Sequence, residues 1–567
     1  MNMTKNKIKG AEALLLSLLK EGVDTMFGYP GGTIIPLYDQ LYNYADRFNH
    51  ILVRHEQCAV HAAEGYARAT GKVGVCLATA GPGATNTVTG IADAYMDSTP
   101  IVCITAQVGV EKLGTNFFQE ADTISITIPV TKWSYQITSA SEIPQIVAKA
   151  FYIARTGRPG PVLISLTKTA QVEMTEFEYG HYRPINVLGE IKSANITSLA
   201  KEAAKMINES KRPLIIAGQG VIISGAERQL CNLAEMGNIP VACTLMGLSS
   251  IATSHPLFAG NVGMHGNLAP NMMTQQSDLI IAIGMRFSDR VTGDTARYAP
   301  NAKVIHIDID KAEFNKNIKT HLAILGDAAE VVATILPKIK SKSRAKWFAF
   351  MKEAWERERG AVIDKALTGS KKGEISMAQA VDALSKAVGG EAIIVTDVGQ
   401  HQMFSARYSK FNKTRSMITS GGLGTMGYGL PAAIGAKIGV PDREVVAVVG
   451  DGGLQMSLQE LGTIMQSGVG VKIVLLNNSF LGMVRQWQEL FFMRRYSFTN
   501  MVNPDFLKIA QAYNIECERV ETYKDLNISL EKMLSHKGAY LLEVKTIKEE
   551  NVFPMVPAGA SLDDIIF

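Results

Sequence analysis

Two oxygen-bearing side chains follow two apolar runs in the C-terminal third of the chain. Asp451 comes directly after the run 445–449, and Asn478 follows the run 471–476. Leucines with helical spacing separate the runs, so the segment indicates a βαβ unit, whose parallel strands end at one edge of a sheet. Glycines beside Asp451 allow close approach of phosphate, and carboxylate and amide oxygens suit Mg²⁺. Either motif alone is commonly a turn or loop; together they predict a site for a cation and a phosphorylated ligand.

Two glutamates in the first third of the chain are candidates for proton transfer. Glu56 follows the apolar run 51–53, whereas Glu64 lies within a stretch of helical pattern. A carboxyl group with this task needs an apolar setting, which holds its proton more tightly. Taken alone, Glu64 is interpreted as a helix residue or ion-pair partner, and Glu56 as a surface carboxylate.

Nucleotide-binding signals in the middle of the chain are weaker. Gly218 and Gly220 follow the apolar run 213–217, but the third glycine of the dinucleotide-binding fingerprint is missing. Asp308 follows the run 304–307 and could accept a hydrogen bond from a ribose hydroxyl group, although a solvated loop explains it as well.

Elements that could position these residues recur along the whole chain. Short apolar runs alternate with helical patterns, which predicts an α/β fold of three doubly wound domains with parallel sheets. A lysine-rich start followed by an apolar stretch favours a first amphipathic helix over a secretion signal, because no cleavage site follows. The expected divisions are 1–170 (first domain), 171–195 (an aperiodic linker with Pro184), 196–335 (central domain), 336–374 (a charged, solvated helical connector), 375–550 (third domain) and 551–567 (a closing tail).

Composition limits the classes of function. The 567 residues include 57 Lys and Arg against 53 Asp and Glu, a net charge of +4, which gives no reason to expect nucleic acid or an anionic membrane as partner. Six cysteines without a C-x-x-C pair indicate reduced thiols and a cytoplasmic protein. No apolar run reaches the roughly 18 residues of a membrane span.

The Gly-Asp-Gly motif followed after some 25 residues by Asn-Asn resembles the signature of thiamine-diphosphate enzymes. The segment from Arg54 to Asn86, RHEQCAVHAAEGYARATGKVGVCLATAGPGATN, is also similar to this family. The resemblance implies that Asp451 and Asn478 bind Mg²⁺ by side chain, and Phe480 by its carbonyl oxygen. It assigns coenzyme contacts to Glu56, Gln400, His401, Met426, Gly452, Gly453, Asn478 and Met483.

The family resemblance also gives Glu56 a role and a partner subunit. Glu56 would hydrogen-bond the aminopyrimidine of the coenzyme and so promote loss of the thiazolium C2 proton. In the family, the residues equivalent to Glu56 and Asp451 at one site come from different subunits. The resemblance therefore implies a homodimer or a dimer of dimers.

Nearly the whole chain resembles the acetohydroxyacid (acetolactate) synthases, in their biosynthetic, FAD-containing form. This implies pyruvate and 2-ketobutyrate as substrates, in branched-chain amino acid synthesis, and a separate small regulatory subunit. The further catalytic positions implied are Gly32, Phe118, Gln119 and Lys168. The substrate positions implied are Met483, Trp487 and Arg290, which would hold a carboxylate. The flavin positions implied are Arg158, Gly218, Gly220, Thr244, Leu245, Met264, His265, Gly284, Arg286, Asp308 and Asp327.

Other interpretations of the same residues stay open at this stage. Taken alone, Arg290 is a surface partner of Asp289, Trp487 a core residue, and Lys168 an exposed lysine. Another thiamine-flavin enzyme, such as a pyruvate oxidase or a glyoxylate carboligase, is the nearest alternative activity. A non-catalytic nucleotide-binding regulator on the same fold is a further alternative, but binding alone would not require Glu56.

Overall fold

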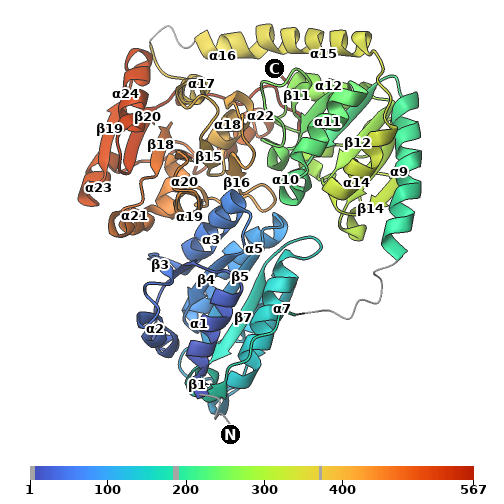
Figure 1. The fold of residues 1–567 in the computed structure, drawn as a ribbon. Coiled ribbons are helices and arrows are strands. Elements are labelled where there is room, and N and C mark those ends of the chain that lie inside the picture. The colour runs from blue at the N-terminus through green and yellow to red at the C-terminus, as the bar shows by residue number, and fades with distance from the viewer. Residues whose placement is uncertain (1–6, 183–190, 369–372) are drawn as a thin grey trace.

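The computed structural model describes residues 7–182, 191–368 and 373–567 of the chain. In these ranges it contains three parallel sheets of six strands each, with helices packed on their faces (Figure 1). The N-terminal domain lies at the bottom of Figure 1, with the central domain at the upper right and the C-terminal domain at the upper left. The predicted α/β class with three parallel sheets is confirmed.

The N-terminal sheet has the strand order β3-β2-β4-β5-β7-β6. Every residue of its inner strands β4, β5 and β7 is buried, as expected for a parallel sheet covered on both faces. Its strands are β2 (Thr25–Gly28), β3 (Asn49–Leu52), β4 (Gly74–Ala78), β5 (Ile101–Gln107), β6 (Trp133–Ile137) and β7 (Val162–Thr167). Its main helices are α1 (Gly10–Lys20), α2 (Ile35–Tyr42), α3 (Glu56–Thr70), α5 (Val88–Met96), α7 (Ile143–Arg155) and α8 (Lys168–Val172).

The central sheet has the order β11-β10-β9-β12-β13-β14, which reverses beside β9, its first strand in the chain. Such a reversal leaves a crevice at the carboxyl ends of the strands, where ligands of open α/β sheets bind. Its strands are β9 (Pro213–Ala217), β10 (Val241–Cys243), β11 (Phe258–Asn261), β12 (Leu279–Ile283), β13 (Lys303–Asp308) and β14 (Leu322–Leu325). Its main helices are α9 (Ile191–Glu209), α10 (Gln219–Ser224), α11 (Glu227–Gly237), α12 (Leu268–Gln276) and α14 (Ala328–Ile335).

The C-terminal sheet has the order β16-β15-β17-β18-β20-β19, so β17 and β18 are neighbours, as the βαβ prediction requires. Its strands are β15 (Ile393–Thr396), β16 (Met417–Thr419), β17 (Val445–Gly450), β18 (Lys472–Asn477), β19 (Glu516–Val520) and β20 (Tyr540–Lys545). Its main helices are α17 (Met377–Ala387), α18 (Gln400–Tyr408), α19 (Gly429–Gly439), α20 (Asp451–Met456), α21 (Leu461–Ser467), α22 (Gly482–Phe491), α23 (Phe506–Ala512) and α24 (Tyr523–Ser535).

Helices α3 and α19 join the N-terminal and C-terminal domains at backbone contact. A Cβ atom on Gly65 would lie 1.9 Å from the carbonyl oxygen of Ala432, and one on Gly435 would lie 1.8 Å from that of Ala62. Only glycine fits at these two positions, because the obstructing atoms belong to the opposite backbone. This contact fixes the N-terminal end of α3, where Glu56 lies, relative to the C-terminal sheet.

Two of the segments between domains differ from the prediction. The expected linker 171–195 contains strand β8 (Met174–Glu176), which pairs with β1 (Lys7–Lys9), and the start of α9; Pro184 lies outside the described residues. The expected solvated connector contains α15 (Ala345–Glu358), which packs on α12 and buries Trp347. Its apolar side chains share one helical face, so the charge of the segment hid its packing.

No helix among the described residues combines the length and the apolar character that crossing a membrane requires. Residues 551–567 pass from the C-terminal domain onto the central domain. The backbone N–H of Val556 donates to the carbonyl oxygen of Met264 at 2.8 Å.

Candidate active site

Glu56 is the first residue of α3 and lies at the carboxyl end of the N-terminal sheet. Its residue surface is 9% exposed, and its Oε2 accepts a hydrogen bond of 2.9 Å from Asn86 Nδ2. A Cβ atom on Gly83 would lie 3.2 Å from its Oε1, so a glycine leaves room on that side. Glu56 is therefore a largely buried, oriented carboxylate and not the surface residue that the sequence alone suggested.

Four further predicted residues belong to the N-terminal domain. Gly32 has open space where a side chain would stand, and Gln119, with φ of 65°, lies against Gly81. Phe118 is 80% exposed. Lys168 begins α8 as an exposed residue after β7.

Asp451 and Asn478 lie at the carboxyl ends of β17 and β18, whose last paired residues are Gly450 and Leu476. Asp451 is 1% exposed, and its Oδ2 accepts a hydrogen bond of 2.6 Å from Asn503. Burial raises the pKa of Asp451 to about 6, so its ionised form needs a positive charge nearby. The oxygens of a carboxylate and an amide at one sheet edge fit a hard cation such as Mg²⁺.

Glycines surround Asp451 and bring the backbone within reach of a ligand. A Cβ atom on Gly452 would lie 2.7 Å from Leu481, and one on Gly453 would lie 2.7 Å from the Asp397 carboxylate. The backbone N–H of Phe480 donates to Asn478 Oδ1 at 3.2 Å, which keeps the backbone of Phe480 beside Asn478. The predicted diphosphate and metal residues are therefore neighbours in the structure.

Gln400 and His401 open α18 beside the same sheet edge. Gln400 donates to the carbonyl oxygen of Glu550 at 2.7 Å and to Gln486 Oε1 at 3.1 Å. Burial lowers the pKa of His401 to about 4, so the ring is neutral at physiological pH. Its Nε2 has no hydrogen-bond partner among the described residues.

A cavity of about 640 Å³ lies where the three domains meet. Ten of the eleven predicted flavin positions line it, from the N-terminal and central domains; they are Arg158, Gly220, Thr244, Leu245, Met264, His265, Gly284, Arg286, Asp308 and Asp327. The eleventh, Gly218, packs behind the wall, because its Cβ would lie 2.2 Å from the carbonyl oxygen of Gly284. Met426, Met483, Trp487 and Arg290 also line the cavity, so the predicted substrate positions share it.

The cavity wall carries both charges. Arg158 donates to Ser98 Oγ at 2.9 Å and pairs with Glu313 at 2.9 Å. Burial lowers the pKa of Arg286, and Asp97 lies close enough to oppose that shift. Two half-buried arginines fit a diphosphate-bearing ligand. The carboxylate of Asp327 already has a structural task, since it accepts hydrogen bonds from the first turn of α14.

Arg290 forms an ion pair with Asp289, as the alternative interpretation of a surface pair predicted. Its Nη1 pairs with Asp289 Oδ2 at 2.7 Å, and its side chain is 62% exposed at the cavity. Trp487 lies half-buried on α22, with its ring 5.1 Å from that of Phe491. Neither residue is part of the core, so both are accessible from the cavity.

Most of the predicted thiamine residues lie outside the cavity. None of Gly32, Glu56, Phe118, Gln119 and Lys168 lines it, and of the predicted coenzyme contacts only Met426 and Met483 do so. Sequence reasoning missed Asn86 and Asn503, whose loops carry no signal of their own. It also missed the cavity residues 420–424, although the run Ser-Gly-Gly-Leu-Gly is a detectable sign of close backbone approach.

Comparison with known families identifies the class of protein. Residues 8–126 match the N-terminal TPP binding domain of thiamine pyrophosphate enzymes, residues 200–335 the central domain, and residues 397–544 the C-terminal TPP binding domain. The chain is therefore a thiamine pyrophosphate enzyme, with its two halves of the coenzyme site on the first and third domains.

Individual relatives narrow the class. The chain is 44% identical to the acetolactate synthase large subunit of Lactococcus lactis, over 98% of this chain and 96% of the relative. It is 43% identical to the acetolactate synthase of Arthrospira platensis, over 99% and 98% of the two chains. The mitochondrial acetolactate synthase catalytic subunit of Saccharomyces cerevisiae is 41% identical over 99% of this chain and 84% of its own. The chain belongs to the acetolactate synthase family.

Proposed function

We propose that the chain is the catalytic subunit of a biosynthetic acetolactate synthase, which decarboxylates pyruvate and joins the remaining two-carbon unit to a second 2-keto acid. The observation that carries the proposal is the pair of oriented acidic side chains, Glu56 at the start of α3 and Asp451 at the start of α20, in a chain of this family. Thiamine diphosphate, when bound, supplies an acidic carbon that adds to a ketone and accepts the electrons released with carbon dioxide.

Glu56 would hold a proton against the pyrimidine ring of the coenzyme. Its low exposure and its hydrogen bond from Asn86 support this role, because a fixed carboxylate moves a proton without reorganisation. Asp451, Asn478 and the carbonyl oxygen of Phe480 would hold Mg²⁺, which would fix the diphosphate group. Gly32, Phe118, Gln119 and Lys168 would face the reacting carbon from the side of Glu56.

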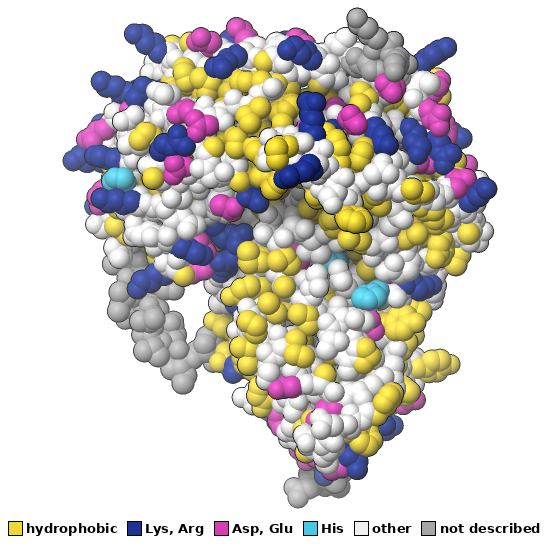
Figure 2. Space-filling model, turned by 180° about the vertical axis from the view of Figure 1, so that it is seen from behind, with side chains coloured by type: hydrophobic (Ala, Val, Ile, Leu, Met, Phe, Trp, Pro, Cys, Tyr) yellow, Lys and Arg dark blue, Asp and Glu magenta, His cyan; other side chains and the backbone are white. Residues whose placement is uncertain are grey.

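Two copies of the chain would complete each site. Glu56 and the four residues predicted to act beside it do not line the cavity that Met426 and Met483 line. This separation fits a site that is shared across a dimer interface. Hydrophobic side chains gather in patches on one face of the molecule (Figure 2). Phe498, near the C-terminal half of the site, is 99% exposed, and Phe118, on the N-terminal half, is 80% exposed. Burial of such rings in a homodimer or a dimer of dimers would be strongly favourable.

The cavity would hold FAD and the acceptor substrate. Arg158 and Arg286 line the cavity and suit a diphosphate, and Gly220 and Gly284, whose backbones pack against each other, also line it. The reaction involves no net electron transfer, so the flavin would be structural. Arg290 would exchange Asp289 for the carboxylate of pyruvate or 2-ketobutyrate, and Trp487 would bound the acceptor pocket.

Product analysis tests the proposal directly. The purified chain is incubated with thiamine diphosphate, Mg²⁺, FAD and pyruvate, with and without 2-ketobutyrate. The expected products are carbon dioxide with 2-acetolactate, and with 2-aceto-2-hydroxybutyrate when both acids are present. Consumption of oxygen with acetyl phosphate or acetate as product would instead indicate an oxidase, and binding of the coenzyme without release of carbon dioxide would indicate a regulator.

Replacement of Glu56 tests the assigned proton transfer. Glu56→Gln is expected to lower kcat by about 100-fold or more, since general acid–base groups contribute on that scale, while the coenzyme still binds. Glu111→Gln, an exposed carboxylate of the same domain, is the matched control and should leave kcat unchanged. A Glu56→Gln enzyme with normal turnover would show that the activating group is another residue.

Two further parts of the proposal concern partners and compartment. The name of the Lactococcus lactis relative, a large subunit, supports a separate small regulatory subunit for this chain. Co-purification with such a subunit, followed by a change in kcat, tests it. The six free thiols support a cytoplasmic location.

A further inference from the structure

A glycine-rich loop between β16 and α19 forms one wall of the cavity. We call residues 420–428 the cavity loop; its members Ser420, Gly421, Gly422, Leu423, Gly424 and Met426 line the cavity. Four of the nine residues are glycine, which offers no side chain to pack and has the most conformational freedom to lose on ordering. The shape of this wall therefore depends on hydrogen bonds to its backbone.

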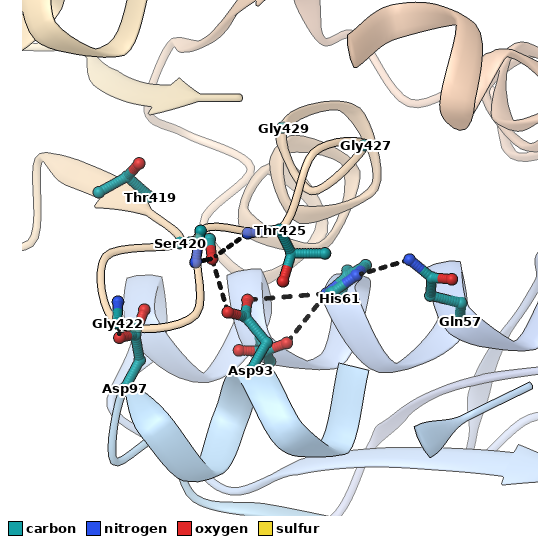
Figure 3. Close-up of polar contacts among 12 residues, drawn as sticks. Gln57, His61, Asp93, Asp97, Thr419, Ser420, Gly422, Thr425, Gly427 and Gly429 are labelled. Carbon is teal, nitrogen blue, oxygen red and sulfur yellow. Dashed lines mark hydrogen bonds and ion pairs between the residues drawn. The ribbon is translucent and has the colours of Figure 1, made fainter. Parts of the chain in front are cut away.

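Asp97 binds the cavity loop directly from the N-terminal domain. It follows the last residue of α5 and is 1% exposed. The backbone N–H of Gly421 donates to its Oδ2 at 2.8 Å, and that of Gly422 donates to its Oδ1 at 2.7 Å (Figure 3). Hydrogen bonds to an ionised acceptor are about twice as strong as neutral ones. Both oxygens of one carboxylate thus hold two consecutive glycines of the wall.

Asp93, one helical turn earlier, holds the loop through Ser420. Ser420 Oγ donates to Asp93 Oδ1 at 2.6 Å and accepts from the backbone N–H groups of Gly424, at 3.0 Å, and Thr425, at 2.8 Å (Figure 3). Helix α5 therefore fixes four backbone N–H groups of the cavity loop, two through Asp97 and two through Ser420. The N-terminal domain sets the shape of a wall to which α5 contributes no lining residue.

Charged groups on the neighbouring elements explain how two buried carboxylates persist here. Arg68 on α3 lies 3.8 Å from Asp97, and a Cβ on Gly422 would lie 2.8 Å from Asp97 and 3.1 Å from Arg286. Burial raises the pKa of Asp97, and the two arginines that it faces, one from its own domain and one from the cavity, oppose that shift and favour its ionised form.

Asp93 has a different neighbourhood, in which the charged groups that act on it are Glu64, Asp97 and His61. His61 Nδ1 lies 3.0 Å from Glu64 Oε1 and 4.0 Å from Asp93 Oδ2, and all three side chains are buried (Figure 3). Burial raises the pKa of both Glu64 and Asp93, so protonated carboxyls are favoured in this group. A hydroxyl or amide can therefore replace the Asp93 charge, provided that an oxygen remains for Ser420.

We propose that Asp97 is a positioning residue for the cavity, together with Asp93, which acts through Ser420. The two carboxyl groups hold the cavity loop in the arrangement that admits a flavin dinucleotide. The inference rests on the proposed function for the identity of the ligand. Its consequence is that two residues outside the cavity lining set the affinity for the ligand. A loop that adopts the competent arrangement only part of the time binds the ligand correspondingly more weakly.

The first test measures FAD affinity of the enzyme stripped of flavin, by quenching of flavin fluorescence. Asp97→Asn keeps the size of the side chain but replaces one acceptor oxygen by an NH₂ group, which opposes the backbone N–H it faces. The expected result is an increase in Kd of about tenfold or more. Asp278→Asn is the matched control, because Asp278 likewise accepts from two consecutive backbone N–H groups, of Lys211 and Arg212, and does not line the cavity.

A second pair of variants separates positioning from loss of structure. Asp93→Asn retains an oxygen for Ser420 and should bind FAD within about twofold of the unaltered enzyme, whereas Asp93→Ala should weaken binding about as much as Asp97→Asn does. Hydrogen exchange at residues 420–425, measured without FAD, should accelerate in Asp97→Asn and Asp93→Ala and stay unchanged in Asp278→Asn.

The outcomes distinguish this inference from the proposed function. If the unaltered enzyme does not bind FAD, the flavin part of the proposed function is wrong, and this inference is wrong with it. Unaltered enzyme that binds FAD, with an Asp97→Asn variant of equal affinity and unchanged exchange in the cavity loop, would overturn the positioning role alone.

Discussion

Gln486 on α22 joins three parts of the site through one buried side-chain amide. Its Oε1 accepts from the backbone N–H of Val552 at 2.8 Å and from Gln400 Nε2 at 3.1 Å, and its Nε2 donates to the carbonyl oxygen of Val552 at 3.2 Å. The residue is completely buried. It thereby holds the tail 551–567 against the helix that carries Met483 and Trp487.

Truncation to Gln486→Ala would remove the hydrogen-bond partner of the N–H and of the carbonyl oxygen of Val552, and one of the two hydrogen bonds of Gln400 Nε2. A buried group left unpaired costs about 1–3 kcal/mol, but water would enter and restore part of that loss. If the free energy that holds the tail in place falls by about 3 kcal/mol, the population with a detached tail rises roughly 100-fold. Since the tail closes over the central domain, we expect a higher KM for pyruvate and a lower kcat.

Hydrogen exchange of residues 551–557 and steady-state kinetics measure the two effects together. Gln488→Ala is the matched control: it removes the same amide from the same helix, but Gln488 binds Ser497 and Thr499 and not the tail. Faster exchange of the tail should therefore occur in Gln486→Ala alone. Unchanged exchange in Gln486→Ala would refute the reasoning, whatever its kinetics.

Two remaining predictions concern stability. Gly65→Ala, whose Cβ would lie 1.9 Å from the carbonyl oxygen of Ala432, should lower the free energy of unfolding by about 1–3 kcal/mol in thermal denaturation, while Gly360→Ala, in open space, should not lower it. Burial raises the pKa of Glu550 from 4.5 to about 7, so its protonated form stabilises the fold below pH 4.5 and this contribution is lost as the pH rises through 7. Glu550→Gln should abolish that part of the pH dependence of the denaturation midpoint; an unchanged profile would exclude Glu550 as its source.

Local patterns were sufficient for the sheets and for half of the site. The runs 213–217 and 445–449 became β9 and β17 with shifts of at most one residue, because continuous apolar runs suit strands buried on both faces. The proximity of Asp451 and Asn478 followed from the same rule, since neighbouring parallel strands end at one edge. The packing of α15 was missed, because its charged residues obscured the apolar face that carries Trp347.

Contacts between segments that are distant in the chain have no sequence signal comparable to the periodicity that predicts strands. Asn86 reaches Glu56 across 30 residues, and Asp97 reaches Gly421 across 324 residues. Each is an ordinary side chain in its own segment. Asn86 gains its partner when the N-terminal domain folds, and Asp97 gains its partner only when two domains pack. The sequence did not decide whether Arg290 pairs with Asp289 or binds substrate. The two residues are adjacent in the chain, and adjacent opposite charges are compatible with both a surface ion pair and a substrate site.

The sequence by itself determined the parallel sheets, the order of the three domains and the residue types at the ends of their strands, because these depend on periodicities of a few residues. Only the tertiary structure decided which side chains share an environment: the burial of Glu56, the common cavity of the predicted flavin and substrate positions, and the hydrogen bonds of Asp93 and Asp97 to the cavity loop. Burial, electrostatic fields and hydrogen-bond partners are properties of packed surfaces, and those surfaces meet only after the domains have folded together.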